Sequence, residues 1–488
     1  MHVTSLPGPY GIGDLGPAAH AWVDALAEAN QTWWQMLPLG PPGAGNSPYQ
    51  CFSAFAGNPD LISPESLAAE GLVARSDLKV VPVRQIRVDF AGASRFKHEL
   101  IGLAWKSFRS GAGRKWNRAF EKFRAGAAEW LEDFSLFMAI RDAHPNRSWT
   151  QWPAALVMRR AGAIKEARDR FAEEVERHEF AQFLFFRQLD ALRAYAKTRG
   201  VKLIGDVPMF VSPESADTWA NPHLFQLDAR RRPKVVAGVP PDYFSKTGQR
   251  WGNPLYNWPA HRREHFRWWV SRIRSALDQA DVVRIDHFRG FAACWEIPAS
   301  APTAQKGRWA KAPGEAMLKT IARELGGLPL IAEDLGLITP DVEKLRDSFG
   351  LPGMRVLQFA FGGDSTNPHL PHNASANTVI YTGTHDNDTT AGWWASAPKD
   401  QKAKARRYAP ALASDVAWEM IRLAWASVSD VAIAPVQDLL GLGSNARMNV
   451  PGQAEGNWGW RLDSLGRLAS PIARLRDMTE LYGRGVVR

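Results

Sequence analysis

Three short apolar stretches of this sequence lead directly into acidic residues. Asp286 follows Val282-Val283-Arg284-Ile285, Glu333 follows Leu330-Ile331-Ala332, and Asp386 lies just beyond Val379-Ile380-Tyr381. Because alternate residues of a strand share a face, Arg284 and Asp286 are expected to point the same way. A guanidinium that close holds a carboxylate ionised, and an ionised, oriented carboxylate can act as a nucleophile. The alternative is a structural ion pair at the end of a strand.

The spacing of the three acids favours catalysis over a purely structural role. Asp286 and Glu333 stand 47 residues apart, and Glu333 and Asp386 stand 53 apart. One strand–helix unit of a barrel takes about 30 residues or more, so each gap fits one or two units. The pattern predicts an α/β fold of the (β/α)8 TIM-barrel type. In such a barrel the C-terminal ends of the strands would bring the three carboxylates to one mouth.

The composition is that of a globular enzyme-sized chain. It has 488 residues, of which 45% are hydrophobic and 23% charged. No run of about 18 apolar residues is present, so no membrane span is expected. The segment Met1–Pro7 has no basic and apolar signal-peptide pattern. Cys51 and Cys294 are the only cysteines, which predicts no disulfide framework and a cytoplasmic location.

The net charge of +10 does not by itself indicate a nucleic-acid partner. The basic residues are spread along the chain without a dense block or a standard nucleic-acid-binding motif. A solvated basic surface is therefore expected, and no nucleic-acid partner. The 21 tryptophans slightly favour a carbohydrate ligand, because indole rings stack on the apolar faces of sugars as well as filling cores.

Two local motifs match patterns of other functions but lack their context. Gly11–Gly16 matches the dinucleotide fingerprint, yet Pro7 and Pro9 precede it where a strand is required. His261-Arg262-Arg263-Glu264-His265 matches a zinc-protease pattern, but no further acid stands out as a third ligand. Two exposed histidines on a helix are expected there, and no metal.

The chain divides by composition into a catalytic barrel, residues 1–59 and 197–488, and an insertion, residues 60–196. The insertion is rich in Ala, Glu, Arg and Phe, with apolar residues such as Phe183 and Leu192 at helical spacing. Loops 230–258 and 441–461 are expected to flank the active-site cleft, and Ala237–Pro254 to lack regular structure. Other expected elements are a helix at Ala18–Ala27 and strands at Thr32–Gly40, Val201–Pro208, Met354–Phe361 and Asp430–Leu439.

Six stretches, spread in order over nearly the whole chain, together resemble a known family. They are Thr4-Ser5-Leu6-Pro7, Ser47-Pro48-Tyr49-Gln50, Gly238–Pro254, Arg284-Ile285-Asp286-His287-Phe288-Arg289-Gly290, Ala332-Glu333-Asp334-Leu335-Gly336 and Gly383-Thr384-His385-Asp386-Asn387-Asp388. The chain in these stretches resembles 4-α-glucanotransferases of the amylomaltase, or disproportionating-enzyme, type, within the wider α-amylase-like group.

The resemblance implies an enzyme that transfers α-1,4-glucan segments between maltooligosaccharides or starch- and glycogen-type glucans, with no metal or organic cofactor. It implies Asp286 as nucleophile, Glu333 as general acid/base and Asp386 as a third carboxylate that grips sugar hydroxyls. A retaining mechanism of this kind needs two carboxyl groups about 5–5.5 Å apart. The substrate-binding residues implied are Tyr49, Asp206, Trp251, Arg284, His385, Asn449 and Trp458.

Two departures from the family pattern carry expectations of their own. Family members begin with an apolar strand, most of which is missing before His2. Either Met1–Ser5 supply a shortened first strand, or the barrel is open there. Ala44 and Gly45 stand where some relatives have an aromatic residue of a secondary glucan site, which implies that such a site is weak here.

Two other functions remain open at this point. One is a hydrolase that uses the same three acids to cleave α-1,4-glucans with water. The other is a catalytically silent glucan-binding protein, which the retention of all three acids argues against.

Overall fold

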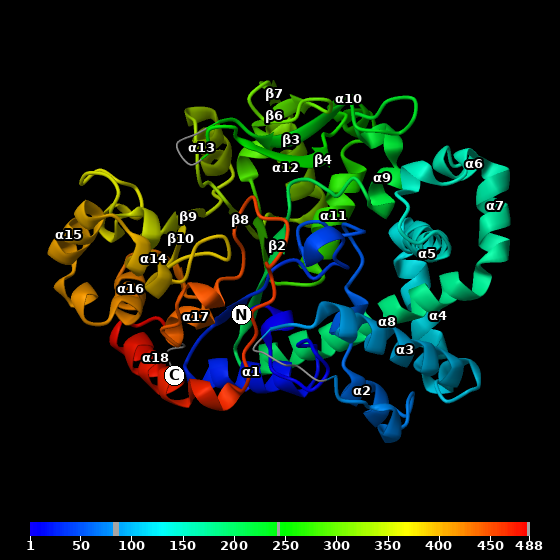
Figure 1. Cartoon of the computed structure of the whole chain (residues 1–488), viewed down its shortest axis with the longest axis horizontal. Coiled ribbons are helices and arrows are strands. Elements are labelled where there is room, and N and C mark those ends of the chain that lie inside the picture. The colour runs from blue at the N-terminus through cyan, green and yellow to red at the C-terminus, as the bar shows by residue number, and fades with distance from the viewer. Residues whose placement is uncertain (82–86, 242–244, 486–488) are drawn as a thin grey trace.

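Parallel strands in two sheets form the centre of the molecule. The computed structural model describes residues 1–81, 87–241 and 245–485. The strand order is β1-β2-β5-β8 in one sheet and β11-β10-β9 in the other, with parallel pairing between all neighbours. The strands are β1 (Trp33–Gln35), β2 (Lys202–Val207), β5 (Val282–Ile285), β8 (Leu330–Ala332), β9 (Gly353–Val356), β10 (Thr378–Tyr381) and β11 (Val431–Ile433) (Figure 1).

Side chains from all of these strands meet in one apolar cluster. The two sheets are also linked where the Ala332 N–H donates to Pro352 O, at 2.9 Å. Among the described residues no hydrogen-bonded pairing joins β11 to β1. The predicted α/β class with parallel strands is confirmed. The cluster consists of buried Ile204, Ile331, Met354, Val356, Val379 and Tyr381, with Trp33, Val282, Leu335, Val431 and Ile433 packed against them.

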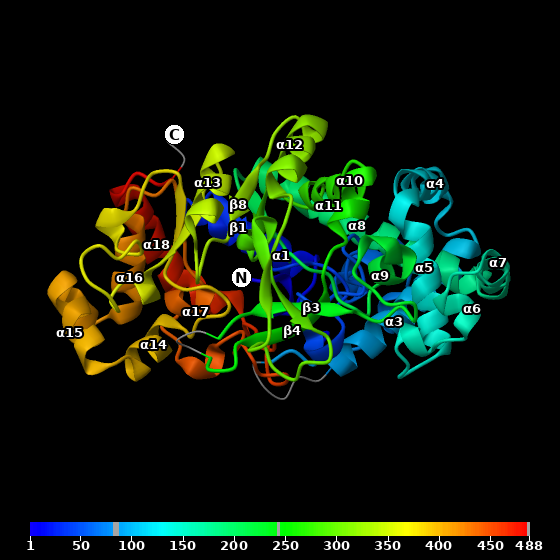
Figure 2. The same cartoon turned by 90° about the horizontal axis from the view of Figure 1, so that it is seen from above.

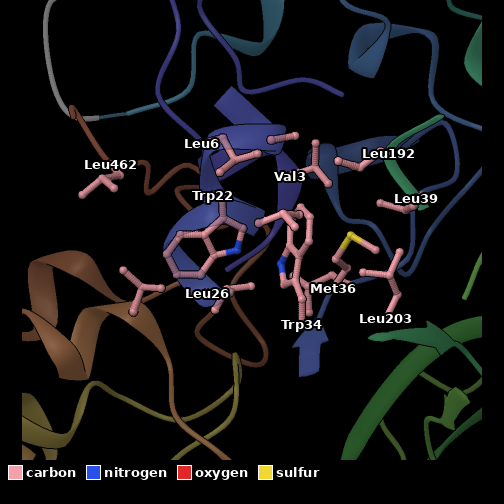
Figure 3. Close-up of a cluster of buried hydrophobic side chains, with 14 of the residues drawn as sticks. Val3, Leu6, Trp22, Leu26, Trp34, Met36, Leu39, Leu192, Leu203 and Leu462 are labelled. Carbon is pink, nitrogen blue, oxygen red and sulfur yellow. The ribbon is translucent and has the colours of Figure 1, made fainter. Parts of the chain in front are cut away.

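A second, larger apolar cluster covers the other face of β1 and β2. Trp34 follows Trp33 in β1, so its side chain points to the opposite face, where it packs with Leu203 of β2. Figure 3 shows these two side chains with Trp22 and Leu26 of helix α1 (Pro17–Glu28) and Leu192 of helix α8 (Ala172–Thr198). Helix α1 matches the predicted helix, and Pro17 lies in its first turn, where a missing N–H costs nothing.

The N-terminal residues do not form a strand. Val3–Ser5 is a short 3-10 helix, so the first of the two alternatives for the N-terminus, a shortened first strand at Met1–Ser5, is wrong. The segment is instead bound by tertiary contacts. The Trp34 indole N–H donates to Met1 O at 2.6 Å, and the Leu462 N–H donates to Ser5 O at 2.8 Å.

The stretch Ala237–Pro254 was expected to be irregular, and this is wrong for most of its described part. It contains the end of β3 (Val235–Val239) and all of β4 (Gln249–Pro254). These strands form an antiparallel sheet with β6 (Ala293–Pro298) and β7 (Arg308–Lys311) in the order β4-β3-β6-β7. A Cβ on Gly238 would lie 2.1 Å from Gln249 O, so the glycine permits this close pairing. Asp242, Tyr243 and Phe244 lie outside the described residues.

Residues 60–198 are mainly helical. Helix α8 packs against α5 and leads into β2, and Figures 1 and 2 show α4–α7 as a lobe at one end of the molecule. Phe183, Leu189 and Leu192 of α8 are buried, which confirms that its apolar stripe is core packing. The helices of this segment are α2 (Pro64–Ala69), α3 (Phe90–Arg109), α4 (Asn117–Gly126), α5 (Ala128–Ala143), α6 (Ala154–Val157), α7 (Ala161–Arg170) and α8.

The remaining helices lie between the strands and after β11. Helices α14–α16 form the opposite end of the molecule from α4–α7 (Figures 1 and 2). None of the described helices is both long and apolar enough to cross a membrane. These helices are α9 (Ala216–Ala220), α10 (Trp258–Arg263), α11 (Arg267–Leu277), α12 (Gly314–Leu325), α13 (Pro340–Ser348), α14 (Thr390–Ser396), α15 (Lys399–Tyr408), α16 (Val416–Trp425), α17 (Val436–Leu439) and α18 (Ala469–Leu481).

Candidate active site

The three acids singled out in the sequence all lie at the C-terminal ends of parallel strands. Asp286 directly follows β5, Glu333 directly follows β8, and Asp386 lies in the loop after β10. Ile285 and Ala332 are register partners in β5 and β8. The Asp286 and Glu333 main chains are therefore neighbours, because parallel strands in register end at the same edge of their sheet.

Arg284 links the strand ends through two carboxylates. Its Nη2 lies 2.9 Å from Asp286 Oδ1, which confirms that Arg284 and Asp286 share a face. Its Nη1 donates to both oxygens of Asp206, each at 2.8 Å. Arg284 and Asp206 are register partners in β5 and β2, and both are buried. One buried cation thus orients the carboxylate of Asp286 and compensates that of Asp206.

Tyr49 connects this ion cluster to an aromatic group. Its hydroxyl donates to Asp206 Oδ2 at 2.6 Å. Burial, together with the Asp206 charge, raises the pKa of Tyr49 well above its usual value, so the hydroxyl keeps its proton. The Tyr49 ring stacks on His385 at 5.1 Å between centroids and lies 5.7 Å from Trp458. The loop after β1, the loop after β10 and loop 441–461 therefore meet at one point.

Glu333 is held by two main-chain donors. The His287 N–H donates to Oε2 at 2.7 Å, and the Leu335 N–H donates to Oε1 at 2.9 Å. Burial, with a further contribution from Asp286, raises the pKa of Glu333 to about 8. Burial also raises the pKa of Asp286, to about 6, against the opposing charge of Arg284. At neutral pH one carboxyl of the pair is ionised and the other protonated, as a nucleophile and a general acid require.

Asp386 is more exposed than the other two acids and is oriented from the opposite loop. Its side chain is 47% exposed. Asn449 Nδ2 donates to Asp386 Oδ1 at 2.6 Å, and His385 Nε2 lies 3.4 Å from the same oxygen. Asn449 and His385 were expected at the site, but Arg447 was not. Its Nη2 donates to Asp386 O at 2.5 Å. No sequence signal distinguishes Arg447 from other loop arginines, because its role depends on the folded loop.

Trp251 approaches the site from the antiparallel sheet. Its ring is edge-on to His287, with centroids 4.9 Å apart, and its indole N–H donates to Gln249 Oε1 at 3.1 Å. Burial lowers the pKa of His287 to about 3, so this ring is neutral. Contacts between strand ends and surrounding loops therefore join all ten residues singled out in the sequence. These are Tyr49, Asp206, Trp251, Arg284, Asp286, Glu333, His385, Asp386, Asn449 and Trp458.

The His261–His265 motif does not form a ligand cluster. His261 was expected to be exposed, and this is wrong, because it is 1% exposed and its ring packs edge-on against Tyr256 at 5.3 Å. Burial lowers the pKa of His261 to about 4. Glu264 instead accepts from His223, at 2.7 Å. Within the described part of the chain no group of three or more His, Cys, Asp or Glu side chains is arranged to hold a metal ion.

Comparison with known proteins assigns this arrangement to one family. Residues 1–466 match the family model described as 4-alpha-glucanotransferase. The chain is 51% identical over 494 residues to the 4-alpha-glucanotransferase of Thermus thermophilus, covering 99% of this chain and 98% of that protein. It is 47% identical over 493 residues to the 4-alpha-glucanotransferase of Synechocystis, covering 100% and 97%.

The structure agrees with that assignment. It matches an amylomaltase from Streptococcus agalactiae, solved in complex with acarbose, with a TM-score of 0.95 and 39% identity over 100% of this chain and 99% of that one. An amylomaltase from Corynebacterium glutamicum matches with a TM-score of 0.73 at 19% identity, over 99% of this chain and 73% of that one, and shows the fold alone.

Proposed function

The chain belongs to the 4-alpha-glucanotransferase family, and we propose that Asp286, Glu333 and Asp386 are the carboxylates with which it transfers glucan segments. The reaction moves a segment of an α-1,4-glucan from a donor chain to a hydroxyl group of an acceptor. One observation carries the assignment of roles. Arg284 lies 2.9 Å from Asp286 Oδ1, whereas the pKa of Glu333 is raised to about 8, so the two acids differ in protonation at neutral pH.

In the first step Asp286 attacks the anomeric carbon of the donor. Arg284 engages Oδ1, so the second carboxylate oxygen is the one available to form the bond. Glu333 gives its proton to the glycosidic oxygen, and the leaving glucan departs with a new hydroxyl group. The product of this step is a covalent glucosyl-enzyme on Asp286, with Glu333 ionised.

In the second step an acceptor sugar replaces the departed glucan. Its hydroxyl group gives a proton to Glu333 and attacks the anomeric carbon, and Asp286 leaves as a carboxylate. Two inversions give net retention. Water would yield hydrolysis by the same route, so transfer requires that the acceptor site favour a sugar over water.

The remaining site residues are proposed to bind the glucan. Tyr49, His385 and Trp458 provide contiguous ring surfaces next to Asp206, the usual way proteins pair an apolar sugar face with polar groups that fix its orientation. Asp386, oriented by Asn449, is proposed to grip hydroxyls of the reacting sugar. Trp251 is proposed to contribute from the antiparallel sheet.

The architecture proposed for this function is one catalytic (β/α)8-type barrel, residues 1–59 and 197–488, with a helical insertion at 60–196. It is supported by the shared apolar cluster of the two parallel sheets and by the TM-score of 0.95 to an amylomaltase. The segment 230–258, which contains β3 and β4, and loop 441–461 are proposed to flank the bound glucan. The expected cytoplasmic location is supported by the free thiols of Cys51 and Cys294.

Incubation with maltotriose tests the proposal. Transfer of a maltosyl segment between two maltotriose molecules gives glucose and maltopentaose, and further rounds give longer glucans. A hydrolase with the same acids would give glucose and maltose alone. Absence of any product longer than maltotriose would overturn the transfer assignment.

A further inference from the structure

The loop that carries Asp386 is bound to loop 441–461 by Arg447, whose guanidinium hydrogen bonds within the described residues all go to main-chain oxygens. Arg447 Nη2 donates to Asp386 O at 2.5 Å, and Arg447 Nε donates to Asn449 O at 2.6 Å. One guanidinium thus bridges the backbones of two residues from different loops. Neither contact is an ion pair, so the fixed, planar geometry of the guanidinium matters more than its charge.

The two residues that Arg447 bridges are also bonded to each other through a side chain. Asn449 Nδ2 donates to Asp386 Oδ1 at 2.6 Å, and the Asn449 N–H donates to His385 O at 3.1 Å. Because the Asp386 side chain is 47% exposed, packing alone does not fix its direction. Its direction is set by the Asn449 amide together with His385 Nε2, and Arg447 holds that amide against Asp386 together with the bond from the Asn449 N–H to His385 O.

We propose that Arg447 is a positioning residue that sets the Asp386 carboxylate against a hydroxyl of the reacting sugar. The inference rests on the proposed role of Asp386 in gripping that hydroxyl. In retaining enzymes a hydrogen bond to the 2-hydroxyl strengthens in the transition state, so a displaced Asp386 lowers the rate for donors that carry this hydroxyl. A purely structural role for Arg447 would instead lower the rate for every donor alike.

The experiment compares α-maltosyl fluoride with its analogue that lacks the 2-hydroxyl on the reacting sugar, with maltose as acceptor and fluoride release as the signal. Arg447→Met keeps the aliphatic stem and removes both donors. It should lower kcat/KM about tenfold to a hundredfold with the complete donor, the size of effect that a misplacement of about 1 Å produces. With the 2-deoxy donor its rate should stay within about twofold of the unaltered enzyme measured on the same donor.

Three further variants separate the possible outcomes. Arg447→Lys should stay impaired, because an ammonium group cannot reproduce the planar fork. Arg484→Met is the matched control, since Arg484 also donates to main-chain oxygens, those of Trp425, Ser427 and Ser429, which precede β11 and so lie at the edge of the sheet opposite the site. It should lower the melting temperature without distinguishing the two donors. Asp386→Asn tests the underlying role and should itself distinguish them.

The inference about Arg447 is wrong if Arg447→Met slows both donors equally, slows neither, or is fully rescued by lysine, while Asp386→Asn distinguishes the donors. If Asp386→Asn does not distinguish them, the proposed role of Asp386 is wrong, and the inference about Arg447 fails with it.

Discussion

The carboxylate of Glu333 accepts a hydrogen bond at Oε2 from the main-chain N–H of His287, the residue after Asp286, at 2.7 Å. His287 has a φ of +54°, a conformation that costs a non-glycine residue about 1–3 kcal/mol. The next N–H, of Phe288, donates to Glu333 O at 3.1 Å. The separation of the two carboxyl groups is therefore set by main-chain donors on the Glu333 side and by Arg284 on the Asp286 side. A retaining mechanism depends on that separation, which is typically about 5–5.5 Å.

Replacement of the proposed nucleophile should abolish turnover without unfolding the protein. Asp286→Asn keeps the shape and the partner of Arg284 but removes the charge that attacks the anomeric carbon. Transfer with maltotriose should fall by about a thousandfold or more, as for nucleophiles of other covalent mechanisms. Product analysis gives the rate, and mass spectrometry verifies that the asparagine has not deamidated.

The matched control for this change is Asp278→Asn, an identical substitution at an exposed position after helix α11. It should leave transfer unchanged. Near-normal transfer by a verified Asp286→Asn protein would show that another group is the nucleophile.

Loss of the proposed acid should be rescued by a donor that needs no proton. Glu333→Gln keeps a hydrogen-bonding group beside the His287 N–H but cannot protonate the glycosidic oxygen. With maltotriose its rate should fall about a hundredfold to ten-thousandfold. With α-maltosyl fluoride, whose leaving group departs as fluoride, the covalent intermediate should still form and be visible by intact-protein mass spectrometry. If no intermediate accumulates with that donor, Glu333 is not the acid.

The pH profile of kcat/KM should show two limbs that belong to the Asp286–Glu333 pair. Activity with maltotriose should rise as Asp286 loses its proton near pH 6 and fall as Glu333 loses its proton near pH 8. Both folded-state pKa values are raised, so each ionisation is less favourable in the folded enzyme than in the unfolded chain. With α-maltosyl fluoride the alkaline limb should disappear from the first step. An alkaline limb that persists with the fluoride donor would assign it to another group.

Local pattern sufficed to predict those parts of the site that depend on strand periodicity. The pairing of Arg284 with Asp286 follows from their spacing of two residues in a strand, and the fold brings Asp286 and Glu333 together because both directly follow strands. That Tyr49, His385 and Trp458 lie at one site was expected only from the family motifs. Nothing in the sequence of their three loops fixes the distances between these side chains.

The features that local pattern missed depend on contacts between distant parts of the chain. Strand β3 pairs with β4 on one side and with β6, more than 50 residues away, on the other, so residues 237–239 alone do not show that they belong to a sheet. His261 is buried because Tyr256 packs against it, and its polar neighbours in the sequence suggested exposure. Arg447 is informative only when the two main-chain oxygens that it bridges are known.

Arg284 is the buried cation that two carboxylates of the site share. Arg284→Met leaves the carboxylates of Asp206 and Asp286 without their shared cation, and breaking a buried ion pair from one side costs about 3–5 kcal/mol of unfolding free energy. Adding Asp206→Asn removes one of the uncompensated charges. The double variant Arg284→Met with Asp206→Asn should therefore lose less unfolding free energy than the two single variants lose together. The difference should be about 0.5–3 kcal/mol. Thermal unfolding of the four proteins at pH 7 measures this coupling. Additive losses would show that Asp206 draws its stability from Tyr49 rather than from Arg284.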